Sequence, residues 1–580
     1  MVTDAEIRKN SPITLGVVHD LARKCGFTLP SDQEDAFLLA LQTSLDIALE
    51  VNALKDYIDP RLRPVATKDG QRTYCRPDEK QENSLNTWCH RFELIANTQD
   101  SHLLTGRRIA LKDTIAVAGI PQTLGTSPRF ISSTGQYPRS KIDAPVVSRL
   151  LLAGATIVGT TTCENYSLSP MSYSAESGPV HNPWARNFNS GGSSSGAAAL
   201  VALGLARQAG VLGLENAGPD VQIAIAGDQA GSIRVPAAYC GIYGLKPTHG
   251  LVPYTGIAGL LPMIDHAGPL ARTVEDIAVC LSAIAGYDGL DARMGPESPL
   301  RENVRQYHDE LAQFIQALPE NKKVLNFSGM GRPLRVGLIL EGFNIQAMSE
   351  EVARTVRHAA EKHFTAMGAY VLDVSIPLHT LGAAIWTAAT RNQMASHAFG
   401  GRASDFLIHD MPHIEYRWPP DQEMCDSLTK HNPAVINTIL GEKILTDINY
   451  VPISAQNKAR RHVLQLRTAY DSAFYNGDFD VLITPATLTV APLHPDMDGG
   501  SALDKLKLAA GSTNNTSPFN ATGHPALSVP CGWGTSSDGV TQLPIGMQII
   551  GKRFDDLCVL KAAKIFELGG GSLGPWPGRV

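Results

Sequence analysis

The sequence predicts an α/β protein, and three observations support this fold class. From Gly106 onward, short apolar runs separated by Gly and Pro alternate with helix-like patterns, as layers of strands and helices require. The chain has 580 residues, 43% of them hydrophobic, so it can bury a large core. The sequence shows no fixed-period repeat or long low-complexity tract, which argues against a solenoid.

Two stretches show the expected step from helix to strand. In the first, we expect Asp143 to cap a helix that begins near Pro145, Gly154 to end it, and residues 155–158 to continue as a strand. In the second, apolar residues recur at helical spacing over 352–367, Gly368 stops the helix, and residues 370–374 read as a strand.

The chain is expected to have two regions. Residues 1–87 contain a helix-like stretch at 32–41 followed by a polar segment, and we expect an N-terminal helical region there. Residues 88–580 are expected to form the main α/β domain. Within it, residues from about 384 to 447 are rich in His, Met, aromatics and Pro, and we expect a helical insertion there.

Charge and cysteine content exclude several classes of function. The 50 basic and 56 acidic residues give a formal charge of −6, so nucleic acid is not an expected partner. Nine scattered cysteines without a CxxC pair indicate reduced, structural thiols. Residues 1–6 resemble no secretory signal and no run has membrane-spanning length, so we expect a cytoplasmic protein without a membrane partner.

Three segments carry candidate chemistry. Lys112 ends a short apolar strand and could act as a base if burial lowered its pKa. A cluster of Ser and Gly at 189–196 precedes an Ala-rich helix; by itself, such a cluster is more often an ordinary helix cap than a functional site. An apolar strand at 225–228 runs into a small-residue turn that ends at Ser232, where backbone N–H groups could stabilise an oxyanion.

Other catalytic interpretations fit less well. Residues 192–196 match GxSxG, but the preceding residues 184–189 are polar and irregular, whereas a nucleophile elbow follows an apolar strand. His409 and His413 have the spacing of helical zinc ligands, but Pro412 lies between them, so we expect no metal. No Walker loop or GxGxxG follows a strand, and we expect no cofactor.

Together the three segments resemble the amidase signature family, particularly bacterial enantioselective and aryl amidases and related fungal enzymes. The order of a Lys, a Ser-rich loop and a terminal Ser is the order in that family. The resemblance extends over about residues 88–568 and implies a mixed central β-sheet covered by helices on both faces. Its motifs are Gly191-Gly192-Ser193-Ser194-Ser195-Gly196, Gly227-Asp228-Gln229-Ala230-Gly231-Ser232-Ile233-Arg234-Val235-Pro236-Ala237 and Gly244-Leu245-Lys246-Pro247-Thr248.

The resemblance implies a mechanism and assigns its residues. Ser232 is the nucleophile, Ser193 a bridging serine on a cis peptide, and Lys112 the neutral base behind it. The backbone N–H groups of four consecutive residues form the implied oxyanion hole: Gln229, Ala230, Gly231 and Ser232. The implied activity is hydrolysis of linear carboxamides through an acyl-enzyme, with a small-molecule amide as the partner.

Three departures from the family pattern bear on this assignment. Ala230 replaces a Gly, which would be strained if that position needed positive φ. Ser195 also replaces a Gly, and the run of three serines leaves Ser194 as an alternative bridging residue. The segment before Ser232 is longer than in the family, with an insertion near 205–219 that either loops outward or displaces a helix.

The resemblance leaves several alternatives open. The same acyl-enzyme would serve an ester hydrolase or an acyl-transfer enzyme of a biosynthetic pathway. The glutaminase subunit of a tRNA-dependent amidotransferase is another alternative. The substrate is not identified by the sequence, and a homodimer remains possible.

Overall fold

A computed structural model describes residues 8, 10–78, 80–319, 327, 332–403, 407–497 and 499–578. The chain divides into two compact units, Met1–Pro60 and Arg61–Val580, here called the N-terminal unit and the large unit. Residues 1–6, on which the expectation about a secretory signal rests, lie outside the described residues. No helix in the described ranges is both long and apolar enough to cross a bilayer.

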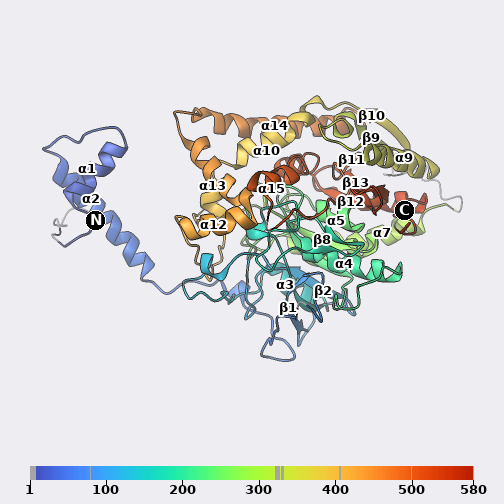
Figure 1. Cartoon of the computed structure of the whole chain (residues 1–580), viewed down its shortest axis with the longest axis horizontal. Coiled ribbons are helices and arrows are strands. Elements are labelled where there is room, and N and C mark those ends of the chain that lie inside the picture. The colour runs from blue at the N-terminus through green and yellow to red at the C-terminus, as the bar shows by residue number, and fades with distance from the viewer. Residues whose placement is uncertain are drawn as a thin grey trace. The chain divides into compact units, whose positions relative to one another are not determined.

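The N-terminal unit is a pair of helices, α1 (Leu15–Lys24) and α2 (Glu34–Asn52), which are the blue helices in Figure 1. Thr14 caps α1 by accepting a hydrogen bond from the Val17 N–H group. The expected helix around residues 32–41 is confirmed as the first half of α2.

The expected domain boundary at residue 87 differs from the division at residue 60. Residues 61–87 belong with the large unit because they are tied to it by polar contacts. Arg72 forms an ion pair with the buried carboxylate of Asp143, and the Val65 N–H donates to the same carboxylate.

The large unit is built on one mixed sheet of eleven strands, which confirms the α/β class. β2 runs parallel to β3 and β6, and β9 runs parallel to β10 and β11, whereas the other neighbours are antiparallel. The strands, in sheet order, are β1 (Trp88–Leu94), β3 (Thr156–Thr161), β2 (Arg108–Lys112), β6 (Ile223–Asp228), β8 (His266–Ala271), β7 (Tyr243–Lys246), β12 (Ala526–Thr535), β13 (Gln542–Ile550), β11 (Val481–Pro485), β9 (Arg335–Ile339) and β10 (Tyr370–Val374).

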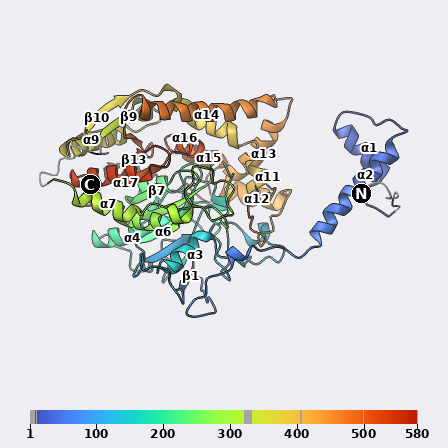
Figure 2. The ribbon, with the colours of Figure 1, turned by 180° about the vertical axis from the view of Figure 1, so that it is seen from behind.

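Helices that pack on the sheet contact one another in two series, and Figure 2 shows α6, α7 and α17 side by side. The first series is α3 (Pro145–Leu152), α6 (Val274–Ile284), α7 (Tyr307–Gln316), α17 (Asp556–Leu568) and α9 (Glu350–Ala366). The second is α4 (Ser195–Gln208) and α5 (Arg234–Cys240).

Both predicted steps from helix to strand are confirmed. α3 begins at Pro145 and leads into β3, and α9 leads through Gly368 into β10. The predicted cap was wrong, because the N-cap of α3 is Ala144 without a side-chain bond. The Asp143 carboxylate is instead occupied by Arg72 and by two backbone N–H groups.

The region predicted as a helical insertion is mostly helical. Trp386 and Phe399 from this region belong to a second core, distinct from the one around the central strands. Its helices are α10 (Gly382–Thr390), α11 (Met394–Ala398), α12 (Gln422–His431) and α13 (Pro433–Thr446).

The remaining elements are short or flank this second core. The helices are α8 (Leu340–Phe343), α14 (Ser454–Tyr475), α15 (Ala502–Ala509), α16 (Ser517–Thr522), η1 (Pro60–Leu62), η2 (Pro128–Phe130), η3 (Asn165–Ser167), η4 (Arg301–Asn303) and η5 (Pro377–Leu381). A separate two-stranded sheet consists of β4 (His181–Asn182) and β5 (Ala185–Asn189). Residues 185–189 were expected to be irregular, but they pair with β4 and so form a strand.

Candidate active site

Lys112 lies at the carboxyl end of β2, in the interior of the sheet. The strand is apolar because β3 and β6 flank it on both sides, and its last side chain is fully buried. β6 is parallel to β2 and ends at Asp228, so the turn that follows β6 lies at the same edge of the sheet as Lys112.

Ser193 lies in the glycine-rich loop before α4. A side chain at Gly192 would collide with the carbonyl oxygens of Ser169 and Met171, so the backbone there is tightly enclosed. The Gly192–Ser193 peptide bond is cis. α4 packs on β2 and β6, and this packing brings the loop against the ends of both strands.

Lys112, Ser193 and Ser232 form a continuous hydrogen-bonded row. Lys112 Nζ lies 2.7 Å from Ser193 Oγ, and Ser193 Oγ lies 2.9 Å from Ser232 Oγ. Ser194 instead donates to the Gly227 carbonyl, and Ser195 donates to Glu164. Of the three adjacent serines, Ser193 is therefore the one between Lys112 and Ser232.

A buried ion pair holds the turn that presents Ser232. The Arg234 guanidinium donates to both carboxylate oxygens of Asp228, and the Ile233 N–H donates to the same carboxylate. Burial acts to raise the pKa of Asp228, but Arg234 and Asn520 outweigh it and hold the pKa at about 2. Both Arg234 and Asp228 are fully buried, so a buried ion pair joins the end of β6 to the start of α5.

The charge state of Lys112 is shifted toward the neutral amine. Burial lowers its pKa from 10.5 to about 8, against the opposing effect of the Asp228 and Glu164 carboxylates. Burial also raises the pKa of Glu164 to about 7, although Ser174 and Ser195 donate hydrogen bonds to it. A lysine with such a pKa can exchange a proton near neutral pH.

The turn from Gln229 to Ser232 is held by hydrogen bonds from two distant segments of the chain. Two of its carbonyl groups accept hydrogen bonds from side chains elsewhere in the fold. Trp386 Nε1 donates to the Gln229 carbonyl, and Thr516 Oγ1 donates to the Ala230 carbonyl. Within the described chain, the backbone N–H groups of residues 229–232 donate to no other residue. They are therefore free to bind a ligand oxygen.

Ala230 is accommodated without backbone strain. The positive φ in this turn belongs to Gly231, at 144°, and Ala230 does not share it. A Cβ at Gly231 would collide with Thr516 and Val235, so that position requires glycine.

A cavity of about 270 Å³ opens onto Ser232 and the turn. It is lined from three directions: by the loop at 167–170, by Leu260, and by Trp386 and Arg391 at the end of α10. Ala434, Asn437, Leu506, Ala509, Ala510 and Thr513 complete the lining. The insertion at 384–447 thus contributes to the wall of the site.

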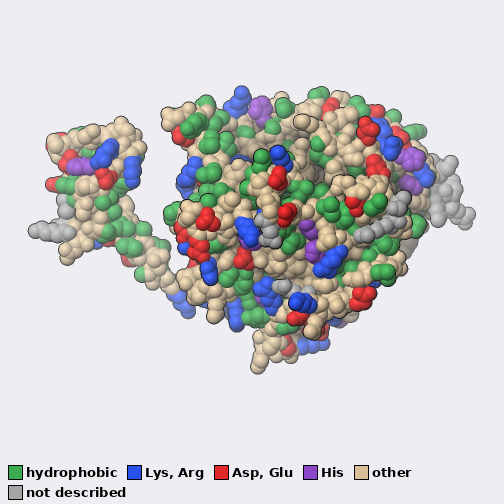
Figure 3. Space-filling model, in the orientation of Figure 1, with side chains coloured by type: hydrophobic (Ala, Val, Ile, Leu, Met, Phe, Trp, Pro, Cys, Tyr) green, Lys and Arg blue, Asp and Glu red, His purple; other side chains and the backbone are tan. Residues whose placement is uncertain are grey.

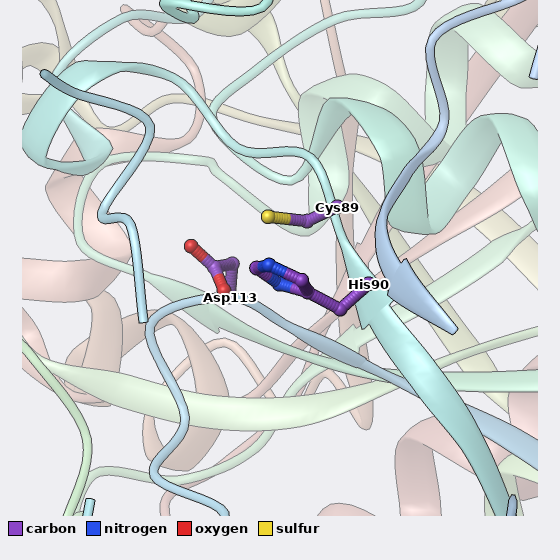
Figure 4. A group of neighbouring side chains, drawn as sticks. All are labelled: Cys89, His90 and Asp113. Atoms are coloured by element: carbon purple, nitrogen blue, oxygen red, sulfur yellow. The ribbon is translucent and has the colours of Figure 1, made fainter. Parts of the chain in front are cut away.

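Among the described residues, one group could hold a metal ion: Cys89, His90 and Asp113, which Figure 4 shows. A bulge at Cys89 in β1 allows two consecutive side chains to approach Asp113. Their ligand atoms lie within 4.8 Å of one another, whereas tetrahedral zinc bonds of about 2.0 to 2.3 Å would place ligand atoms roughly 3.3 to 3.8 Å apart. Asp113 also accepts two hydrogen bonds from Thr123.

His409 and His413, which the sequence spaces like zinc ligands, belong to no such group among the residues that the structure describes. Residues 407–415 are not helical, and His413 Nε2 lies 2.8 Å from Gln122 Oε1.

The insertion predicted near 205–219 loops outward. α4 continues undisturbed to Gln208, and a loop then leads to β6. The loop packs through buried Leu214 and Ala217, while the Leu212 side chain is 89% exposed. α4 has 14 residues and is therefore about 21 Å long, which separates this loop from Ser193.

Sequence reasoning did not assign Glu164, Arg391 or Asn520 to the site. Arg234, which donates a hydrogen bond to Asn520, lies inside a motif that matched the family pattern, so a signal was present there. Glu164 and Arg391 lie outside any motif, and only the fold brings them near the row of hydrogen-bonded side chains.

Comparison with known proteins shows the family to which the chain is similar. The family model described as amidase matches residues 85–560. The chain is 32% identical over 555 residues to the enantioselective amidase of Rhodococcus rhodochrous, covering 93% of this chain and 92% of the relative. It is 30% identical over 474 residues to a glutamyl-tRNA(Gln) amidotransferase subunit of Methanosarcina acetivorans, covering 80% and 84% respectively.

A solved structure agrees as well. The native peptide amidase of Stenotrophomonas maltophilia superposes with a TM-score of 0.57 at 27% identity, covering 81% of this chain and 84% of that protein. The fold and the matched region define a class of hydrolases, with a mixed sheet and surrounding helices, that act on C–N amide bonds. The chain belongs to the amidase signature family, as the sequence motifs predicted.

Proposed function

We propose that this protein hydrolyses linear carboxamides to a carboxylate and ammonia or an amine, with Ser232 as nucleophile. The observation that carries the proposal is the row from Lys112 through Ser193 to Ser232, with steps of 2.7 and 2.9 Å. A serine hydroxyl becomes nucleophilic only when its proton has an acceptor, and this row supplies one.

In the first step, Lys112 acts as a neutral amine. Its lone pair accepts the Ser193 proton while Ser193 accepts the Ser232 proton, since each hydroxyl hydrogen can rotate between its two neighbours. Ser232 Oγ bonds to the carbonyl carbon, and the carbonyl oxygen becomes an oxyanion. The N–H groups of Gln229, Ala230, Gly231 and Ser232 would stabilise that charge.

In the second step, the proton returns along the same row to the amide nitrogen. The C–N bond breaks, the amine leaves neutral, and an ester to Ser232 remains. A water molecule then attacks the ester with Lys112 again as the proton acceptor, and the carboxylate is released. No metal or organic cofactor is needed for these steps.

The test compares the wild type with Ser232→Ala on a series of aliphatic and aryl amides. We expect the variant to lose all turnover above background while its thermal unfolding midpoint stays that of the wild type. A fluorophosphonate probe should label Ser232 in the wild type, as peptide mass spectrometry would show. Retained turnover in Ser232→Ala, or labelling at Ser194 instead, would contradict the mechanism.

Ester hydrolysis, acyl transfer and an amidotransferase-type glutaminase use the same acyl-enzyme and are separated by the products. We propose free hydrolysis, with a small-molecule amide as partner and the cytoplasm as location; the relative from R. rhodochrous, an enantioselective amidase, favours it. Adding hydroxylamine or an amine acceptor during turnover would reveal acyl transfer as a hydroxamate or a new amide.

Size-exclusion chromatography with light scattering would show whether the protein is a homodimer.

Nucleic acid is not a proposed partner. Figure 3 shows acidic and basic side chains interspersed on the visible face of the large unit, with neither sign gathered into one broad area.

We propose residues 88–580 as the catalytic domain, because every residue of the row and of the turn lies in that range.

A further inference from the structure

Arg391 is a partly buried cation in the cavity that contains Ser232. It directly follows α10 and lines the cavity together with Ala230 and Trp386. Its guanidinium carbon lies 5.8 Å from the centre of the Trp386 ring, a cation–π arrangement. The positive charge is therefore held in place inside the same cavity as the nucleophile.

Arg391 lacks a counter-charge among the described residues. Its guanidinium donates to the Thr438 hydroxyl and to no carboxylate or carbonyl group of the described chain. Other buried arginines differ: Arg234 is paired with Asp228, and Arg149 donates to several backbone carbonyl groups. Burial lowers the pKa of Arg391 only to about 10, so it stays charged at neutral pH.

A buried charge without a partner is costly, and the site becomes more stable when a ligand supplies the opposite charge. The rest of the cavity is mainly apolar and suits a hydrocarbon body, with Leu168, Pro170, Leu260, Ala434, Leu506 and Ala509 in its wall. The cavity therefore combines three features: a nucleophile, an apolar wall and an unpaired guanidinium.

We infer that Arg391 binds a carboxylate on the substrate, so that the preferred substrates are half-amides: amides with an apolar body and a carboxylate away from the scissile bond. The guanidinium fork would donate two parallel hydrogen bonds to the carboxylate oxygens. This inference rests on the proposed hydrolysis at Ser232 and adds a substrate class to it.

The test measures kcat/KM for matched pairs of amides of equal chain length, such as adipamate and hexanamide. The wild type should prefer the carboxylate member of the best pair by about tenfold to hundredfold, the range of a charge-assisted hydrogen-bonded pair. Arg391→Met should abolish that preference, and Arg391→Lys should retain part of it. Arg129→Met is the matched control, because Arg129 lies on the surface and is 70% exposed.

A binding measurement makes the test independent of turnover. Calorimetry with Ser232→Ala should show that adipamate binds more tightly than hexanamide, and that adding Arg391→Met removes the difference. An equal preference in wild type and Arg391→Met, or none in the wild type at any chain length, would overturn the inference. Hydrolysis of neither member, with selective adipamate binding intact, would instead refute the proposed function alone.

Discussion

The pKa of Lys112 decides the pH range in which the site can work. Above its pKa of about 8 the amine is neutral and accepts a proton; below it the ammonium cannot. We therefore expect kcat/KM to rise about tenfold per pH unit up to about pH 8 and then to level off. A pH–rate profile with a stable amide substrate measures this limb.

A substitution at Glu164 should shift the rising limb of this pH profile. Its carboxylate favours the ammonium form of Lys112, so Glu164→Gln should lower the pKa of Lys112 and shift the rising limb to lower pH. Glu176→Gln is the matched control, because it removes an exposed carboxylate that does not contribute to the pKa shift of Lys112. A limb that stays unmoved, or shifts to higher pH, in Glu164→Gln would exclude this electrostatic link.

At the scale of elements, the Asp228–Arg234 pair joins the end of β6 to the start of α5. Arg234→Met would leave a buried, uncompensated carboxylate, which costs about 3 to 5 kcal/mol. We expect a clear fall in the thermal unfolding midpoint, measured by circular dichroism, and a loss of turnover as the Ser232 turn moves. Arg129→Met, which breaks an exposed ion pair, should leave the unfolding midpoint unchanged. An equal fall in both variants would argue against a special role of the Asp228–Arg234 pair.

The elements near the site were largely predictable, and the contacts between them were not. Local sequence patterns predict the elements themselves: apolar runs indicate strands β2 and β6, and the Ala-rich segment indicates helix α4. The strand β5 was missed because its partner β4 is only two residues long and its own residues are polar. Asp143 was misassigned because its partner Arg72 lies far away in sequence, and no local pattern reports such a pairing.

At the scale of the whole molecule, all proposed catalytic residues lie within the large unit. A chain that begins at Arg61 should therefore fold and hydrolyse amides with kcat/KM within about threefold of the full chain, since the large unit is a compact unit with its own core. Circular dichroism and turnover of the same amide measure both expectations. A chain that folds but is inactive would show that the N-terminal unit takes part in catalysis.

The outward loop after α4 has a practical consequence. Leu212 is 89% exposed, and the length of α4 separates it from the Ser193 loop. Once the exposed Cys25 and Cys75 are replaced by serine, a cysteine introduced at position 212 offers an attachment point from which the protein could be tethered to a resin or electrode. Substrate could then diffuse freely to the cavity, because the anchor would sit a full helix away from the place where bonds are made and broken.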